Sequence, residues 1–281
     1  MHEFLHILIH SVLDTLKLLP FLILTYLLME YLEHKMSDKA AAVINRAGKL
    51  GPVLGGVLGI VPQCGFSAAM SNLYAGGLIT RGTLLAVFLS TSDEMLPILI
   101  SRQVPAGLIL KILAVKVISA IIAGVLADLI FKAHKNADIH DLCENENCHC
   151  EHGIFISALK HTGQILLFIF IVNFALTAVI EYIGEDSLAN FIMNKPVVGE
   201  LLSGLIGLIP NCASSVAITE LYLSGGMSTG AMLSGLLTGS GIGLLVLFRM
   251  NKNPKDSFKM LAILYISGVV LGFLFGLLPI F

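Results

Sequence analysis

The sequence predicts an all-α polytopic membrane protein with two homologous halves, on three observations. Of its 281 residues, 56% are hydrophobic and 13% are charged, which is far more apolar than one soluble core requires. Apolar runs long enough to cross about 30 Å of hydrocarbon, at roughly 1.5 Å per helical residue, recur along the chain. The third observation is an internal repeat. In each half we expect two long transmembrane helices, a re-entrant Pro-x-Cys hairpin and a broken helix, with the halves forming an inverted repeat.

Apolar runs of transmembrane length stand near the start and the end of each half. They are Leu13 to Leu32, Leu108 to Phe131, Ile165 to Ile183 and Phe258 to Leu278. The first run exceeds the core of a signal peptide and lacks a small-residue cleavage site, so we expect it to be retained as a helix. We therefore expect a multi-pass protein of the cell (inner) membrane, with the lipid bilayer as its partner. A net charge of -2 argues against nucleic acid as a partner.

The internal repeat pairs residues at one fixed spacing. Counting from Cys64 to Cys212 gives 148 positions, and this spacing aligns GGVLGIVPQCGFSAAMSNLYAGG with SGLIGLIPNCASSVAITELYLSG without a gap. A Pro-x-Cys motif, a Leu-Tyr pair, several glycines and a lysine recur in register, which chance matches in apolar sequence do not explain. The predicted organisation is a first membrane repeat at 1–131, a His/Cys-rich loop at 132–156 and a second membrane repeat at 157–281.

Each Pro-x-Cys motif follows a segment too short to cross the membrane. The stretch from Gly51 to Val61 spans only about 17 Å as a helix, so we expect it to turn at Pro62-Gln63-Cys64 and leave as a second limb. Glycines in the first limb would let the two limbs pack closely. One long kinked helix that crosses once is the alternative. Re-entrant hairpins give each half an odd number of crossings and so make the repeats inverted, as in secondary transporters with a midplane site.

The central loop carries a strong metal-binding signal. Its candidate ligands are His140, Cys143, Cys148, His149, Cys150 and His152. Thiolate and imidazole groups at such short spacings can bind zinc, copper(I) or a thiophilic metalloid. Free thiols persist more readily in reducing cytosol, which favours a cytosolic loop and, with it, the inverted repeat. A polar linker without metal is the plainer interpretation. We expect no obligatory cofactor, only a zinc or other ion on this loop besides the transported metal ion.

A pair of acids, Asp93 and Glu94, lies near the centre of the apolar segment 82–100. Ionised carboxylates deep in a membrane are costly without a cation, a proton or a water-filled cavity, so they are candidate site residues. Hydroxyl groups precede the acids and recur at the matching place in the second half: Ser90, Thr91 and Ser92, then Thr238 and Ser240. The second half has no acid there, which predicts an asymmetric site. A surface loop between two short helices is the alternative.

The two hairpin tips supply amide, thiol and hydroxyl groups. These are Gln63, Cys64 and Ser67 in the first half, and Asn211, Cys212, Ser214 and Ser215 in the second. If the hairpins are inverted, their tips converge at the midplane near the two acids. A mixed sulfur and oxygen set suits a transition or heavy metal better than Na⁺ or Mg²⁺. Asp93, Glu94, Cys64 and Cys212 are then the expected metal ligands. A buried cysteine can equally be a small apolar filler, and Lys116 can line a pathway or be paired at a helix end.

The Pro-Gln-Cys and Ser-Thr-Ser-Asp-Glu motifs resemble those of the ten-transmembrane heavy-metal exporters, a family also labelled manganese transporters or arsenic efflux proteins. Arsenical permeases look like distant relatives. The resemblance covers nearly the whole chain, including both broken halves and the His/Cys-rich loop. It implies ten hydrophobic segments, hence five in each half, which agrees with the odd number of crossings.

Together these patterns predict a secondary transporter that exports a divalent or heavy-metal ion such as manganese, coupled to a proton or another cation. No G-x-x-x-x-G-K-[ST] loop occurs, which argues against a built-in ATPase, and no H-E-x-x-H motif supports an intramembrane metalloprotease. We therefore expect no enzyme activity. The alternative is a carrier of an arsenical, another oxyanion or a small organic solute, in which helix ends and hydroxyls cradle the substrate.

Overall fold

The computed structural model describes most of the two membrane repeats. The described residues are 12–13, 15–16, 19–20, 22–24, 27, 50–61, 64–92, 95–131, 159, 162–172, 174–175 and 197–278. Within these ranges all regular structure is helical, as predicted, and no strand occurs. Several predicted site residues lie outside them: Gln63, Asp93, Glu94 and the metal ligands of the 132–156 loop, as do the side chains of Cys64 and Cys212.

Helices in the two halves follow the same order. The first half has α3 (Gly51–Leu58), α4 (Cys64–Ala75), α5 (Arg81–Ser90), α6 (Met95–Ser101) and α7 (Ala106–Ile130). The second half has α11 (Val198–Gly207), α12 (Cys212–Leu223), α13 (Thr229–Thr238), α14 (Gly243–Met250) and α15 (Pro254–Gly276). The first residues of α4 to α7 recur 148 positions later as the first residues of α12 to α15. The sequence spacing is therefore also the spacing of the helices.

Four segments of the described residues are long and apolar enough to cross a membrane: Arg81–Ser101, Ala106–Ile130, Thr229–Met250 and Pro254–Gly276. The second and fourth confirm the predicted apolar runs that begin at Leu108 and Phe258, within a few residues. The first and third are each divided between two helices, α5 and α6 in one case and α13 and α14 in the other. A shorter apolar helix, Thr162–Val172, covers part of the run predicted from Ile165.

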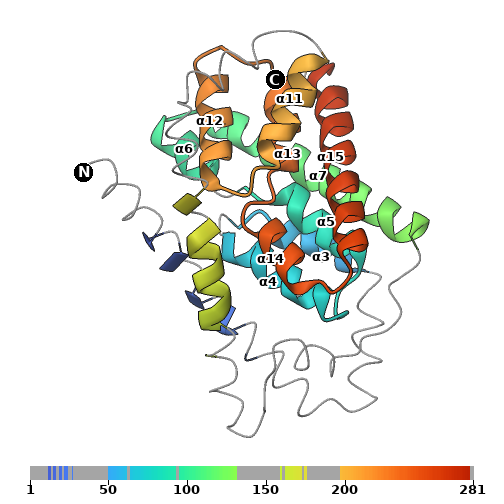
Figure 1. Cartoon of the computed structure of the whole chain (residues 1–281). Helices are drawn as coiled ribbons and strands as arrows, with labels where there is room; N and C mark the ends of the chain where they lie inside the picture. Colours follow the sequence, from blue (N-terminus) through green and yellow to red (C-terminus); the bar gives the residue numbers. More distant parts are fainter. Residues whose placement is uncertain are drawn as a thin grey trace, which may run out of the picture.

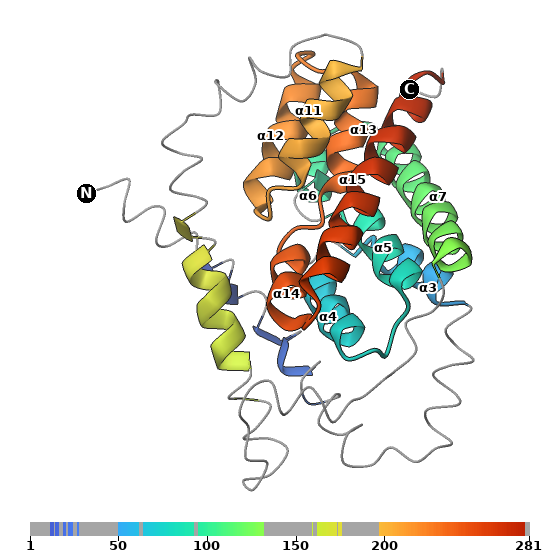
Figure 2. The same ribbon diagram turned by 45° about the vertical axis from the view of Figure 1, so that its right-hand side comes forward.

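The two long helices lie outside the two divided ones. On α7, Leu110 and Leu129 are exposed, and on α15, Phe258 and Ile266 are exposed, whereas α5 and α13 are buried along nearly their whole length. In Figures 1 and 2, α7 and α15 run along the outside of the helix cluster. Apolar side chains that face outward along a helix of this length are suited to contact with lipid.

Helices of the two halves pack against each other at both ends of the molecule. Helix α4 packs against α14 of the other half, and α12 packs against α6. Figures 1 and 2 place the α4–α14 pair at the lower end and the α6–α12 pair at the upper end. Corresponding helices, α4 and α12, thus occupy opposite ends of the molecule.

The glycines of α3 pack against other helices than the one predicted. A Cβ on Gly51 would meet the Thr83 side chain, and a Cβ on Gly56 would meet Ile121. These neighbours belong to α5 and α7, and the glycines at positions 55 and 59 likewise face α5 or α3 itself. The expectation that these glycines pack the two limbs of a hairpin together is therefore wrong. The second limb, α4, instead packs on α14 and α5.

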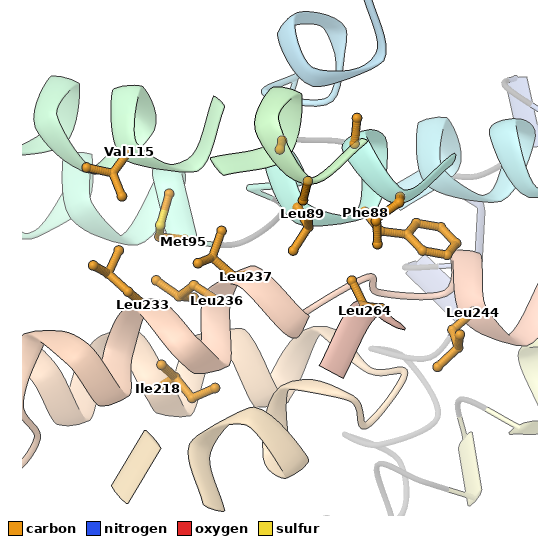
Figure 3. Close-up of a cluster of buried hydrophobic side chains, with 14 of the residues drawn as sticks. Phe88, Leu89, Met95, Val115, Ile218, Leu233, Leu236, Leu237, Leu244 and Leu264 are labelled. Carbon is orange, nitrogen blue, oxygen red and sulfur yellow. The ribbon is translucent and has the colours of Figure 1, made fainter. Parts of the chain in front are cut away.

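The main hydrophobic core joins the halves. Figure 3 shows Met95 and Val115 of the first half beside Leu233, Leu236 and Leu237 of the second. All five are at most 5% exposed. Because this core links α6 and α7 to α13, it surrounds the places where the two divided helices are interrupted.

Candidate functional site

A small cavity lies where the two divided helices are interrupted. Its lining residues are Thr91, Ser92, Met95, Lys116, Asn211, Ser214, Ser215, Leu236, Gly239 and Gly241. The volume is about 10 Å³, close to the roughly 10–15 Å³ that one water molecule needs by the same measure. Thr91 and Gly239 occupy the same position of the repeat, 148 residues apart. One pair of equivalent positions from the two halves therefore meets at this cavity.

Hydroxyl groups fix the first interruption. The backbone amide of Thr91 donates to the Val87 carbonyl at 3.0 Å, and its hydroxyl donates to the same carbonyl at 2.7 Å. The Ser92 hydroxyl donates to the Ile60 carbonyl at 2.6 Å. The Ser92 bond gives a partner to a backbone carbonyl just beyond the end of α3, and the Thr91 hydroxyl adds a second donor to a carbonyl already bonded within α5. They hold the chain just before Asp93 at the end of α3.

The second interruption relies on glycine. The Gly239 amide donates to the Gly235 carbonyl at 3.0 Å and closes the last turn of α13. Gly241 then adopts a φ of 54°, a left-handed conformation that glycine reaches without the steric cost other residues meet. It stands where the first half has Asp93, 148 positions earlier. The second half thus contributes backbone and hydroxyl groups at the place where the first half carries an acid.

The first turn of α12 forms another wall of the cavity. Asn211 caps this helix, because its side-chain oxygen accepts from the Ala213 amide at 3.0 Å. The Ser214 hydroxyl donates to the Asn211 carbonyl at 2.8 Å. Asn211 and Ser215 thus line the same cavity as Ser92, while the predicted approach of the tips to Asp93 and Glu94 falls outside the described residues. Whether these groups bind substrate stays a prediction.

Lys116 is the charged group of the cavity that sequence reasoning ranked low. It lies in α7 with 1% of its surface exposed, and its Nζ donates to the Leu236 carbonyl of α13 at 2.5 Å. The sequence signal was one of two lysines inside a 25-residue apolar helix. The matching position of the second half is Leu264, so this charge also makes the site asymmetric.

Four other predicted site residues do not line the cavity. The Ser90 hydroxyl donates to the Val87 carbonyl at 3.1 Å, and the Thr238 hydroxyl donates to the Gly204 carbonyl at 2.9 Å. Ser67 is buried against Gly243, where an added Cβ would meet the Ser67 side chain at 2.8 Å. Ser240 is 1% exposed, and its hydroxyl has no hydrogen-bond partner in the described part of the chain. Ser240 thus keeps an unused donor beside the cavity wall.

Ion pairs connect the halves at both ends, away from the cavity. At the α4–α14 end, Arg81 pairs with Asp256, whose other carboxylate oxygen accepts from the Tyr74 hydroxyl at 2.6 Å. At the α6–α12 end, Arg102 donates to both carboxylate oxygens of Glu220, at 3.0 and 2.9 Å. The first pair is largely buried and the second is exposed.

No cluster of three or more His, Cys, Asp or Glu side chains occurs among the described residues. The described lining of the cavity consists of hydroxyl, amide, backbone and thioether groups with one lysine. The charged and thiol groups expected to bind metal lie outside the described residues, as stated above. Ser92 nevertheless directly precedes the two acids in the chain.

Comparison with known proteins identifies one family. The family model described as "Putative, 10TM heavy-metal exporter" matches residues 3–191, more than half of the chain. The chain belongs to this family. No curated protein and no solved structure matches the chain.

Membership in the exporter family makes the chain a multi-pass membrane protein and a member of a transporter family. The range matched by the heavy-metal exporter family includes the Pro-Gln-Cys motif, the two acids and the His/Cys-rich loop. It ends before α11, so the α12 and α13 walls of the cavity lie beyond the matched residues. The 148-residue repeat connects those walls to the matched first half.

Proposed function

We propose that this protein exports a divalent or heavy-metal ion, such as manganese, by secondary active transport. One observation carries the proposal: a small cavity at the interruptions of both divided helices, lined by residues of both halves that include hydroxyl, amide and amine groups. Transporters with repeated halves place their substrate near the midplane, where discontinuous helices meet. The proposed site therefore lies between the halves, at the middle of the membrane.

The proposed ligands come from both sides of this interface. Asp93 and Glu94 supply charge, Cys64 and Cys212 supply soft sulfur, and Gln63 with Asn211 holds the tips. Carboxylates compensate a divalent charge, while thiolates favour transition and heavy metals over Mg²⁺. Ser92 and Ser215, both in the cavity lining, add hydroxyl oxygens. A proton or another cation is the proposed counter-ion, and zinc or a similar ion on the 132–156 loop is a further proposal.

The cavity volume supports an occluded state in this proposal. Among the described residues, the cavity leaves space for only about one water molecule. Transport then requires the helices around the cavity to separate first at one end and then at the other. The ion pairs between halves, one at each end, are suited to close these routes alternately.

Loss of both acids tests the proposed export. In cells that express the chain, Asp93→Ala combined with Glu94→Ala is expected to raise accumulated manganese, zinc or cadmium to the level of cells without the protein. The control combines Glu33→Ala with Asp38→Ala, which removes two acids from a polar stretch of the sequence. Equal expression is checked in membranes. Unchanged accumulation and tolerance in an expressed Asp93, Glu94 double variant would contradict the proposal.

A second candidate function is export of an oxyanion or a small organic acid. Lys116 and the first turn of α12 favour it, because a lysine and a helix N-terminus both attract anions. Thermal unfolding of the purified protein separates the two. Stabilisation by MnCl₂ or ZnCl₂ supports the cation exporter, whereas stabilisation by arsenite or succinate alone supports the anion carrier.

A further inference from the structure

Lys116 stands at the carbonyl end of an interrupted helix. Its Nζ donates to the Leu236 carbonyl at 2.5 Å, and the side chain lines the cavity together with Gly239. Helix α13 ends at Thr238, two residues after Leu236. The last turn of a helix leaves carbonyls without intrahelical partners. Lys116 therefore binds one of the acceptors that the interruption exposes.

The same place is suited to a metal ion. Aligned peptide dipoles give the C-terminal end of a helix about half a negative charge. In transporters with divided helices, such ends and the unwound carbonyls beside them coordinate cations. The Lys116 amine thus lies at the C-terminal end of α13, where the backbone carbonyl oxygens could otherwise bind an ion. Because the Lys116 amine already donates to the Leu236 carbonyl, a metal ion that used this oxygen as a ligand would compete with the amine.

We propose that Lys116 is a tethered cation, which fills the ion site in the absence of substrate and must be displaced by the transported metal ion. This inference rests on the proposed export of a metal cation. Its value to the transporter is in the return step. With Lys116 in place, the empty site keeps a positive charge, so the protein can return to its other open side without a bound metal ion.

Metal binding to the purified full-length protein tests the competition. MnCl₂ is titrated by calorimetry into the unaltered chain, Lys116→Met, Lys116→Gln and Lys116→Arg. If the lysine occupies the site about nine-tenths of the time, removing its charge tightens apparent binding about tenfold. Lys116→Arg keeps a competing charge and is expected to bind no more tightly than the unaltered chain. Lys111→Met, an exposed lysine of the same helix, is the matched control and leaves affinity unchanged.

Unchanged or weaker binding in both neutral variants overturns the inference. Lys116→Gln retains a donor for the Leu236 carbonyl, so it preserves the hydrogen bond if Lys116→Met unfolds. A measurement on the unaltered chain avoids variants of the site: with ¹⁵N-labelled lysine, CdCl₂ is expected to shift the Lys116 Nζ resonance and leave that of Lys111 in place. An unmoved Lys116 signal at saturating cadmium overturns the inference as well.

Transport in liposomes supplies a readout that a purely structural role would not produce. Net manganese efflux by Lys116→Gln is expected to fall several-fold, while exchange of manganese for manganese continues, because only the unloaded return step needs the tethered cation. An equal loss of both rates overturns the inference. Absence of metal binding and transport in the unaltered chain overturns the proposed function, and this inference with it. Metal transport with equal losses overturns the inference alone.

Discussion

Gly82 lies at a close contact between α5 and α7. A Cβ at this position would stand 2.1 Å from the Gly124 carbonyl oxygen and 2.5 Å from the Asp128 carboxyl carbon. The Asp128 carboxylate also accepts from the Gly82 amide at 2.7 Å, so it caps the first turn of α5. Any side chain on Gly82 must therefore separate α5 from α7 and disturb the hydrogen bond between Asp128 and the Gly82 amide.

Gly82→Ala is expected to lower the free energy of unfolding by about 1–3 kcal/mol, the usual cost of forcing an extra group into a well-packed contact. Unfolding of the purified protein in detergent measures this. Gly107→Ala is the matched control, because a Cβ at Gly107 of α7 would meet nothing within 4 Å. Equal stability of the two variants would contradict the close contact.

In the second half, a different acid lies near the N-terminus of α13, the helix that corresponds to α5. Glu200, in the first turn of α11, is buried with its side-chain oxygen near Gly230, the equivalent of Gly82. In the first half Asp128 reaches the same position from the last turn of α7. An acid near a helix N-terminus is favourable. The first half supplies it from α7 and the second half from α11. The sequence alignment did not reveal this, since the two acids do not align.

Lys116 shows a further limit of sequence reasoning. Its position inside an apolar helix indicated a buried charge, but the sequence could not say which helix supplies its acceptor. That acceptor, the Leu236 carbonyl, is 120 residues away in the other half. Ser92 and Asn211 were easier to place, because the repeat puts their segments at corresponding interruptions.

The α4–α14 end and the α6–α12 end are closed with unequal strength. At the first end, the Tyr74 hydroxyl donates to Asp256 at 2.6 Å and accepts from the Arg81 Nε at 3.2 Å. At the second end, the Arg102–Glu220 pair is exposed, and exposed ion pairs contribute about 0–1 kcal/mol. The first end should therefore be the more costly one to open.

Tyr74→Phe tests this difference. Loss of a buried hydrogen bond to a charged group is expected to cost about 1.5–3 kcal/mol of stability. Tyr222→Phe, at the matching position of α12, is the control, because none of the hydrogen bonds among the described residues involves its hydroxyl. It should change stability by much less. If unfolding in detergent gives the same loss for both, the Tyr74 network does not close its end in the way described.

Helix boundaries were well predicted by the repeat, whereas helix partners were not. The Pro-x-Cys motifs and the 148-residue spacing place the starts of α4 and α12, because the same local sequence breaks the chain in both halves. An apolar helix face predicts that the face is buried, but it does not identify the helix that packs against it. Hence the packing of α4 on α14, and of the α3 glycines on α5 and α7, could not be read from the pattern.

The arrangement of the whole protein supports inverted repeats, which remain a proposal. Helices α4 and α12 are equivalent, yet Figures 1 and 2 place them at opposite ends. If the long helices α7 and α15 cross the bilayer, these ends face opposite sides of the membrane. A residue just after α12 and a residue between α14 and α15 should then be accessible from different sides.

Cysteine labelling measures this directly. Ser224 follows α12 and Asn253 precedes α15, and both are exposed. On a background with the native cysteines replaced by serine, Ser224→Cys and Asn253→Cys are expected to react with a membrane-impermeant maleimide from opposite sides. Gln103→Cys, exposed beyond α6, is the internal control and should react from the same side as Ser224→Cys, since α6 packs on α12. Reaction of all three from one side would exclude the inverted arrangement, because equivalent helices would then share an orientation.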